Sequence, residues 1–337
     1  MTLQAAPSTE VKDRLYGFWI SQGLSVVAAL GIADQLAGGA KSSDELAELT
    51  DCHGPSLYRL LRALSSVGIF KEDERARFSL TPPSQLLRTD GQDSIDAEVR
   101  HVLHPSTWAS WGDLLHCVQT GEAAFPRVFG EDVWTYRARN VQAGAVFDRM
   151  ASAKCRQDFN LLIAAMDFSN VATIADIGGG NGAVLAEILG QQARLRGILF
   201  DQPHVVADAG QVLEGAGVLD RCTIVPGNFF EEVPVRCDMY LLKAILHNWN
   251  DDAAQAILRN CRQAMLPNGR IAVIELVLEP SPSRFESFID LHMLVIHGGR
   301  QRTAAEFKAL LAAAGFELTG LRKTADGMSV LEGKPAG

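Results

Sequence analysis

The sequence predicts an α/β fold in which a mainly parallel C-terminal sheet follows a smaller, mostly helical, winged-helix-like N-terminal domain. Two observations carry this prediction: β-prone apolar segments alternate with amphipathic segments after residue 167, and a glycine-rich turn separates the first such pair. Alternation of this kind is typical of parallel sheets covered by helices on both faces. We expect strands at 172–176, 197–201, 222–226, 237–242 and 270–277, helices at 183–190, 203–213, 251–265 and 303–314, and a terminal hairpin from 316–323 and 328–333.

The chain of 337 residues is longer than one hydrophobic core usually serves. We therefore predict an N-terminal domain at 1–100, a helical linker and pocket region at 101–155, and a sheet domain at 156–337. A net charge of −9 argues against non-specific binding to nucleic acid. The sequence has no membrane-length apolar run or apolar leader, and its six cysteines form no C-x-x-C pair. We expect a cytoplasmic protein with free thiols that does not bind membranes.

The first hundred residues follow the order helix, turn, helix and hairpin. Apolar residues recur with a helical period over 11–36, Ser42 precedes an acidic helix start, and 55–64 predicts a second helix. Short apolar pairs flank a polar tip within 69–80, which completes a winged-helix plan. Acidic residues outnumber Lys and Arg between 41 and 100, so we expect a dimerisation or scaffold role in place of DNA binding.

The segment before the sheet domain is rich in aromatic residues, most of which we expect in the core. Those nearest the glycine-rich turn, together with side chains from 285–298, are candidates for a pocket that takes a flat ligand. The candidates are Phe147, Met150, His292 and Met293. The histidines at 101, 104 and 116 lack acidic or thiol partners at metal-ligand spacing, so we expect no metal site.

The glycine-rich turn is the strongest functional signal in the chain. Gly178, Gly179 and Gly180 follow a strand and precede a helix, so the backbone can turn sharply and a ligand can approach the main chain and the helix N-terminus. Asp201 closes the next strand about 20 residues later, where such folds place an acid that bonds ribose hydroxyls. Asp176, two residues before the first glycine, is suited to a cationic ligand such as the sulfonium and ammonium groups of S-adenosylmethionine (SAM).

The glycine pattern alone leaves the nucleotide open. Gly178, Gly180 and Ala183 also fit the dinucleotide motif G-x-G-x-x-A, which keeps a nicotinamide-dependent oxidoreductase as an alternative. Ligands of parallel sheets bind beyond the carboxyl ends of the strands. By that rule we expect one edge of the sheet, called the rim below, to carry Asp176, Asp201, 227–229, 243–247 and Glu275.

Eight short sequence motifs, spread over most of the chain, together indicate a specific family. They are 57–64 (LYRLLRAL), 68–70 (GIF), 121–125 (GEAAF), 176–182 (DIGGGNG), 200–203 (FDQP), 227–230 (GNFF), 242–252 (LKAILHNWNDD) and 298–303 (GGRQRT). With them the chain resembles the caffeate- and acetylserotonin-type small-molecule O-methyltransferases, a cation-independent, SAM-dependent family. The resemblance implies a Rossmann-like SAM methyltransferase sheet behind a winged-helix-like dimerisation domain, and hence a homodimer that methylates an aromatic or polyketide-like acceptor.

The resemblance also implies roles for single residues. The glycines at 178–180 would hold the methionine part of SAM, and Asp201 would take the ribose hydroxyls. Asn228 and Phe229 would flank the adenine, and Lys243 would lie near the cofactor. His247 would be the general base on the acceptor hydroxyl, oriented by Glu275, with Gln301 as a third member of the catalytic group. Asn248 would lie beside the base, at the substrate.

The chemistry of methyl transfer is consistent with these roles. A phenol has a pKa near 10, so little phenolate exists at neutral pH without help. A neutral imidazole can take the phenolic proton as the oxygen attacks, and an acid on its other ring nitrogen fixes the tautomer.

Three positions depart from the family pattern. Asn228 and Asn248 stand where the family often has aspartate, and Gln301 stands where it usually has a second glutamate. A glutamine can hold the imidazole by a hydrogen bond but does not offset its positive charge. These departures keep open a SAM-binding relative that does not methylate. N-methylation of an aromatic acceptor is a second alternative because it need not use a base, and the winged-helix plan keeps a SAM-sensing DNA-binding regulator as a third.

Overall fold

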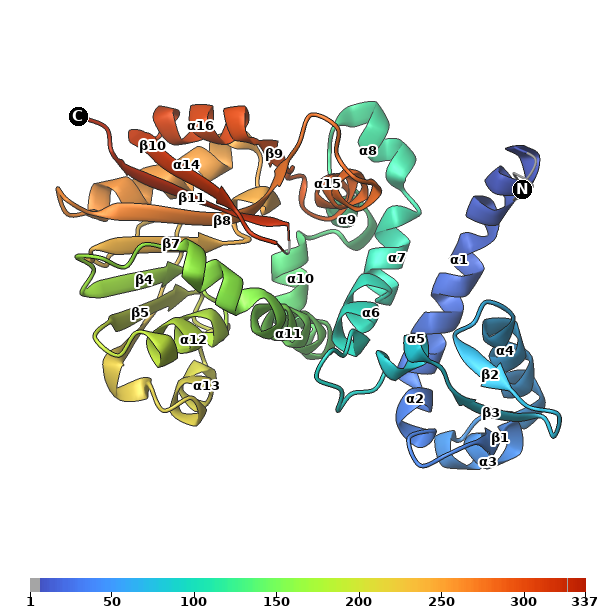
Figure 1. Ribbon diagram of the computed structural model, residues 1–337. Coiled ribbons are helices and arrows are strands. Elements are labelled where there is room, and N and C mark those ends of the chain that lie inside the picture. The colour runs from blue at the N-terminus through green and yellow to red at the C-terminus, as the bar shows by residue number, and fades with distance from the viewer. Residues whose placement is uncertain (1–6, 326) are drawn as a thin grey trace, which may run out of the picture. The chain divides into compact units, whose positions relative to one another are not determined.

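The computed structural model describes residues 7–325 and 327–337, without the side chains of 7 and 153–158. The chain divides into two compact units, 1–108 and 109–337, with the boundary inside helix α7 (Pro105–Trp111). Each unit is described by itself below, and Figure 1 labels the elements of both.

Unit 1 is a helical unit that contains a small antiparallel sheet. Its elements are α1 (Pro7–Ala29), α2 (Ile32–Gln35), β1 (Lys41–Ser42), α3 (Ser43–Thr50), α4 (Gly54–Ser66), β2 (Phe70–Glu72), β3 (Arg77–Leu80), α5 (Pro82–Gln85) and α6 (Asp96–Val102). The strands lie in the order β1-β3-β2. Helix α3 begins as the sequence predicts, because Ser42 accepts the backbone N–H of Glu45 while the Glu45 carboxylate accepts that of Ser42.

One prediction in unit 1 is wrong. The helix expected over 11–36 breaks after α1, because Gly31 adopts a left-handed conformation with φ of 63° before α2 begins. The apolar residues expected on one face of that helix also differ in burial, since some lie in the core and others are exposed. Val27 is buried in the core with Leu61 and Phe78, whereas Leu15 and Trp19 are each 60% exposed.

Unit 2 begins with helices and continues into the sheet. The helices are α8 (Leu114–Thr120), α9 (Ala124–Phe129), α10 (Val133–Arg139) and α11 (Val141–Ala165). The elements that follow are β4 (Thr173–Ile177), α12 (Ala183–Gln191), β5 (Arg196–Asp201), α13 (Ala209–Gly215), η1 (Leu219–Arg221), β6 (Cys222–Pro226), β7 (Met239–Lys243), η2 (Leu246–Asn248), α14 (Asp251–Ala264), β8 (Arg270–Leu278), α15 (Arg284–His297), β9 (Arg302–Thr303), α16 (Ala304–Ala313), β10 (Phe316–Lys323) and β11 (Met328–Pro335).

The sheet of unit 2 has the order β10-β11-β8-β7-β4-β5-β6, with the short β9 paired to β8. Strands β4 to β8 are parallel, and β10 and β11 form the antiparallel edge hairpin that the sequence predicts. The strand order reverses direction between β4 and β7, so the carboxyl ends of these two strands flank a topological switch point. Helices α11 to α13 cover one face, and α14 and α16 cover the other.

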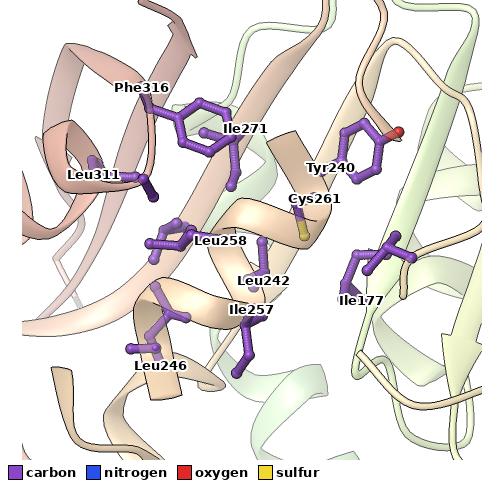
Figure 2. Close-up of a cluster of buried hydrophobic side chains, with 14 of the residues drawn as sticks. Ile177, Tyr240, Leu242, Leu246, Ile257, Leu258, Cys261, Ile271, Leu311 and Phe316 are labelled. Atoms are coloured by element: carbon purple, nitrogen blue, oxygen red, sulfur yellow. The ribbon is translucent and has the colours of Figure 1, made fainter. Parts of the chain in front are cut away.

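The second of these faces is packed by large aliphatic and aromatic side chains. Figure 2 shows Leu242 and Ile271 of the sheet against Leu258 of α14 and Leu311 of α16. All four are fully buried, and each contributes about 1.5–3 kcal/mol by leaving water. The core therefore holds the strand ends, and with them the rim of the sheet, in fixed positions.

Two segments of unit 2 differ from the prediction. The helix expected at 203–213 begins only at Ala209, because the Gln202 carbonyl accepts the N–H groups of Val205 and Val206 in a turn. Helix α15 was not expected; it begins at a Ser283–Glu286 capping box and ends at Gly298 with φ of 69°. Five cysteines are free thiols, and the side chain of the sixth, Cys155, lies outside the described residues.

Candidate active site

The glycine turn after β4 has the left-handed backbone that its sequence requires. Gly178 and Gly180 have φ of 71° and 61°, and a Cβ on Gly178 would lie 2.6 Å from the Ile245 side chain. At Gly180 the corresponding space is open. A Cβ on Gly179 would lie 2.6 Å from the Asp176 carboxyl group. The turn therefore presents bare backbone at the start of α12, where a ligand can come close.

Asp201 is held against this turn by main-chain donors. Its Oδ2 accepts the Gly180 N–H at 2.9 Å, and its Oδ1 accepts the Gln202 N–H at 2.6 Å. Burial raises the pKa of this carboxyl group, and the two N–H donors oppose that shift. Because each carboxylate oxygen has a second lone pair, Asp201 can still accept from a pair of hydroxyl groups.

Asp176 is the most strongly perturbed acid at the rim. It is 2% exposed, and its Oδ2 is buried with no hydrogen-bond partner. Burial raises its pKa to about 7, and the negative charge of Asp201 acts in the same direction, whereas Lys243 at the end of β7 lowers it. A buried carboxylate that lacks a partner is suited to a cationic ligand.

A cavity of about 550 Å³ lies along the same rim. Its lining includes Gln202 after β5, Asn228 after β6 and Trp249 after η2, with Trp134 from α10. The ring of Trp249 is stacked on that of Trp134 at 6.3 Å and meets that of Phe229 edge-on at 6.1 Å. Flat aromatic walls with an amide at one side suit a heteroaromatic ring. Trp249 and Gln202 are site residues that the sequence analysis did not name, although both lie inside quoted strings.

The Asn228 side chain makes hydrogen bonds within the turn that follows β6. Its Oδ1 accepts the Phe230 N–H at 3.0 Å, and its Nδ2 donates to Glu231 at 3.2 Å. Its remaining Oδ1 lone pair is the one that a ligand could use. Phe229 is half-buried, and its ring edge lies 3.4 Å from the position of a Cβ on Gly178, so it stands between the aromatic cavity and the glycine turn.

The turn between β7 and η2 has a strained backbone, and η2 itself carries His247. Ala244 has φ of 55°, which costs an ordinary residue about 1–3 kcal/mol. The Asn248 amide stabilises this turn by donating to the carbonyls of Ala244 at 3.0 Å and Ile245 at 3.2 Å. Asn248 is therefore a buried support of the loop, and its place beside the substrate stays a prediction.

His247, Glu275 and Gln301 come together as the resemblance implies. Glu275 of β8 is fully buried, and its Oε1 accepts the His247 backbone N–H at 3.2 Å. Its Oε2 lies 3.0 Å from His247 Nδ1 but has no hydrogen-bond partner, so the two side chains are in contact without hydrogen-bond geometry. Gln301 Nε2 lies 3.3 Å from the same Nδ1, while Gln301 Oε1 is buried with no partner. The opposite orientation of the amide places Oε1 beside Nδ1 and suits a proton on Nδ1.

A segment after α15 clamps the loop that carries His247. A Cβ on Gly299 would lie 2.2 Å from the His247 carbonyl oxygen, so only glycine fits there. The guanidinium of Arg302 is 1% exposed and donates to the carbonyls of Leu246 at 2.9 Å and Trp249 at 2.8 Å, and to Asp251 at 2.9 Å. Neither residue was named as functional from the sequence, although both lie in the matching string 298–303.

The predicted pocket residues separate into two places. Phe147 and Met150 are half-buried on α11, and the Phe147 ring meets Trp134 edge-on at 5.6 Å, beside the cavity. His292 of α15 accepts from Trp111 Nε1 at 3.0 Å and stacks on its indole, and Met293 is 5% exposed.

The described residues contain neither a cluster of metal ligands nor a membrane-spanning helix. No group of three or more His, Cys, Asp or Glu side chains in the described part of the chain could hold a metal ion. Among the described helices, none is long and apolar enough to cross a bilayer.

Comparison with known proteins gives matches over almost the whole chain. A family model described as an O-methyltransferase domain matches residues 111–317, and one described as an O-methyltransferase dimerisation domain matches residues 13–90. The phenazine O-methyltransferase PhzM of Lysobacter antibioticus is 44% identical over 97% of this chain and 96% of its own length.

Two solved structures are similar over their full architecture. The mitomycin 7-O-methyltransferase MmcR has a TM-score of 0.95 at 35% identity, with 98% of each chain covered. The O-methyltransferase NcsB1 of neocarzinostatin biosynthesis, in complex with SAM and 2-hydroxy-5-methyl naphthoic acid, has a TM-score of 0.86 at 29% identity, with 94% of this chain and 96% of that chain covered.

Proposed function

The chain belongs to the family of SAM-dependent small-molecule O-methyltransferases, and we propose that it methylates a hydroxyl group of an aromatic or polyketide-like acceptor with His247 as the general base. The observation that carries this proposal is the contact of 3.0 Å between His247 Nδ1 and the buried Glu275 carboxylate. Relatives that act on phenazine and mitomycin compounds support an aromatic acceptor.

The residues of the rim fit SAM as the cofactor. The open backbone at Gly180 has room for the methionine chain. The Asp176 oxygen that has no partner suits the cationic centre, and the acceptor oxygens of Asp201 suit the ribose hydroxyls. The cavity beside Trp249 and Asn228 suits the adenine ring. When bound, SAM supplies an electrophilic methyl group on a positively charged sulfur.

The protein's own residues then act on the acceptor hydroxyl. A rotation of the imidazole that points the Nδ1 proton at Glu275, whose Oε2 is 3.0 Å away, would leave Nε2 to accept the hydroxyl proton of the acceptor. The buried carboxylate stabilises the imidazolium that forms. Gln301, with its amide oxygen toward Nδ1, supports the same tautomer without adding a charge. Residues that hold the acceptor hydroxyl close to the transferred methyl group would add a proximity contribution to the rate.

The assembly that we propose is a homodimer formed through the N-terminal unit. Support comes from the dimerisation-domain match and from the apolar surface of α1, where Val11, Leu15 and Trp19 are at least 60% exposed in the single chain. Apolar surface of this extent on one helix is typical of an interaction site. We also propose a cytoplasmic location, which rests on the biosynthetic relatives.

Pairs of matched acceptors test whether the enzyme methylates a hydroxyl oxygen or an amino nitrogen. Purified protein is incubated with methyl-labelled SAM and pairs of acceptors that differ only in a hydroxyl or an amino group, such as 1-hydroxyphenazine and 1-aminophenazine. We expect label on the hydroxyl member, with a rate that falls in His247→Ala. Preferential transfer to the amino member, with no dependence on His247, would favour N-methylation. Binding of SAM without transfer to any acceptor would favour a relative with other chemistry.

A further inference from the structure

Arg137 of α10 lies against two aromatic rings beside the proposed cofactor cavity. Its guanidinium carbon is 5.0 Å from the centre of the Trp134 ring and 4.0 Å from that of the Phe147 ring, and the two rings are nearly perpendicular. Cation–π contacts of this kind stabilise the positive charge without using the N–H donors of the guanidinium.

This guanidinium lacks the partners that a buried cation needs. Nη1 is buried without a hydrogen-bond partner, and within the described part of the chain Arg137 forms no ion pair. Burial lowers its pKa to about 9, although the charge of Asp148 favours the protonated form. Two neighbouring arginines do have polar partners: Arg302 donates hydrogen bonds to three oxygens, and Arg139 forms an ion pair with Glu131 at 3.0 Å.

The surroundings of Arg137 point to the ligand that supplies the missing partner. Trp134 lines the cavity that also contains Gln202, Asn228 and Trp249. Phe147 and Asp148 are adjacent on α11, and the charge of Asp148 also acts on Asp201. Arg137 therefore contacts the Trp134 wall of this cavity, and it is not itself one of the residues that line it.

We propose that Arg137 receives a ligand carboxylate, a role that rests on the proposed function. A carboxylate matches the planar fork of a guanidinium with two parallel hydrogen bonds. It has two possible sources, which are the methionine carboxylate of SAM and a carboxylate on the aromatic ring of the acceptor. A hydroxylated aromatic acid is already an acceptor-type ligand in the NcsB1 structure.

The experiment compares ligands that differ in the carboxylate. Calorimetry on wild type, Arg137→Gln and the control Arg259→Gln, an exposed arginine of α14 outside the cavity lining, uses two cofactor probes. They are S-adenosylhomocysteine (SAH) and 5′-methylthioadenosine, which lacks the amino-acid chain and with it the carboxylate. Two acceptor probes, 1-hydroxy-2-naphthoate and 1-naphthol, are titrated with SAH present. If the cofactor is the source, Arg137→Gln weakens SAH binding roughly tenfold to a hundredfold and leaves methylthioadenosine unchanged. If the acceptor is the source, only the naphthoate loses that affinity.

The proposal is overturned if Arg137→Gln binds SAH and the naphthoate as wild type does, or if it loses SAH and methylthioadenosine equally. If Arg137→Gln does not fold, as judged by its thermal midpoint, Arg137→Lys carries the same comparison, because it keeps the charge and loses the planar fork. A wild-type protein that binds no SAH would instead contradict the proposed function itself.

Discussion

At the scale of single residues, Asp176 illustrates how the fold provides a partner for a cationic ligand. Its carboxyl group is buried with one oxygen that has no partner, at the end of the strand that leads into the glycine turn. Its pKa of about 7 lies above the unfolded value of 3.8. Ionised Asp176 therefore destabilises the free protein, and the free energy of unfolding falls as pH rises through the window between these two values.

This shift predicts a pH dependence of cofactor affinity. A cationic ligand prefers the ionised carboxylate, so SAM binds more tightly above the free pKa than below it. Between pH 6 and pH 8 we expect an increase in affinity of about tenfold, measured by calorimetry, and little further change at higher pH. Asp176→Asn removes the titrating group and should flatten the profile. A wild-type affinity that is constant across this range would contradict the role of Asp176.

At the scale of elements, the segment after α15 fixes the loop that carries His247. Gly299 touches the backbone of residues 247–249, and the Arg300 N–H donates to the His247 carbonyl at 3.0 Å. Arg302 ties both ends of η2 through its three acceptors. Movement of the loop would break this group of contacts, so we infer that Arg302 and Gly299 position the proposed base.

Gly299→Ala tests this clamp. The added Cβ must displace the His247 carbonyl, which lies 2.2 Å from its position, and a shift of the base by about 1 Å can cost a hundredfold in rate. We expect kcat to fall tenfold to a hundredfold with a changed pH–rate profile, while SAH still binds. Gly210→Ala, which has open space around its Cβ, is the control and should behave as wild type. Unchanged kcat in Gly299→Ala would mean that the loop does not depend on this contact.

Local signals in the sequence predicted much of unit 2, and non-local contacts explain what they missed. The strands and the glycine turn were found because β-prone runs and glycines act within a few residues. The carbonyl acceptors of Arg302 lie more than fifty residues away, and no pattern in the sequence displays them. Likewise, the sequence shows α15 less plainly than the other helices, because its start depends on the Ser283–Glu286 capping box and its pattern of apolar residues is weak.

At the scale of the whole molecule, the exposed apolar surface of α1 has a consequence for assembly. We expect wild type to sediment as a dimer of the 36.5 kDa chain at micromolar concentration. Trp19→Glu places a charge on a side chain that is 60% exposed in the single chain, and should dissociate the dimer without unfolding it. Leu321→Asp, at a 40% exposed position in unit 2, is the control and should remain dimeric. A monomeric wild type would contradict the dimer.

The central claim is that His247 takes the acceptor proton, and a rate comparison across acceptors tests it most directly. Turnover of wild type and His247→Ala is measured on hydroxyl acceptors of graded acidity, with SAH affinity determined in parallel. We expect unchanged SAH affinity and a loss of about 10²- to 10⁴-fold in rate for acceptors whose pKa lies well above the assay pH, with a smaller loss for more acidic ones. Full activity of His247→Ala on the least acidic acceptor would contradict the account.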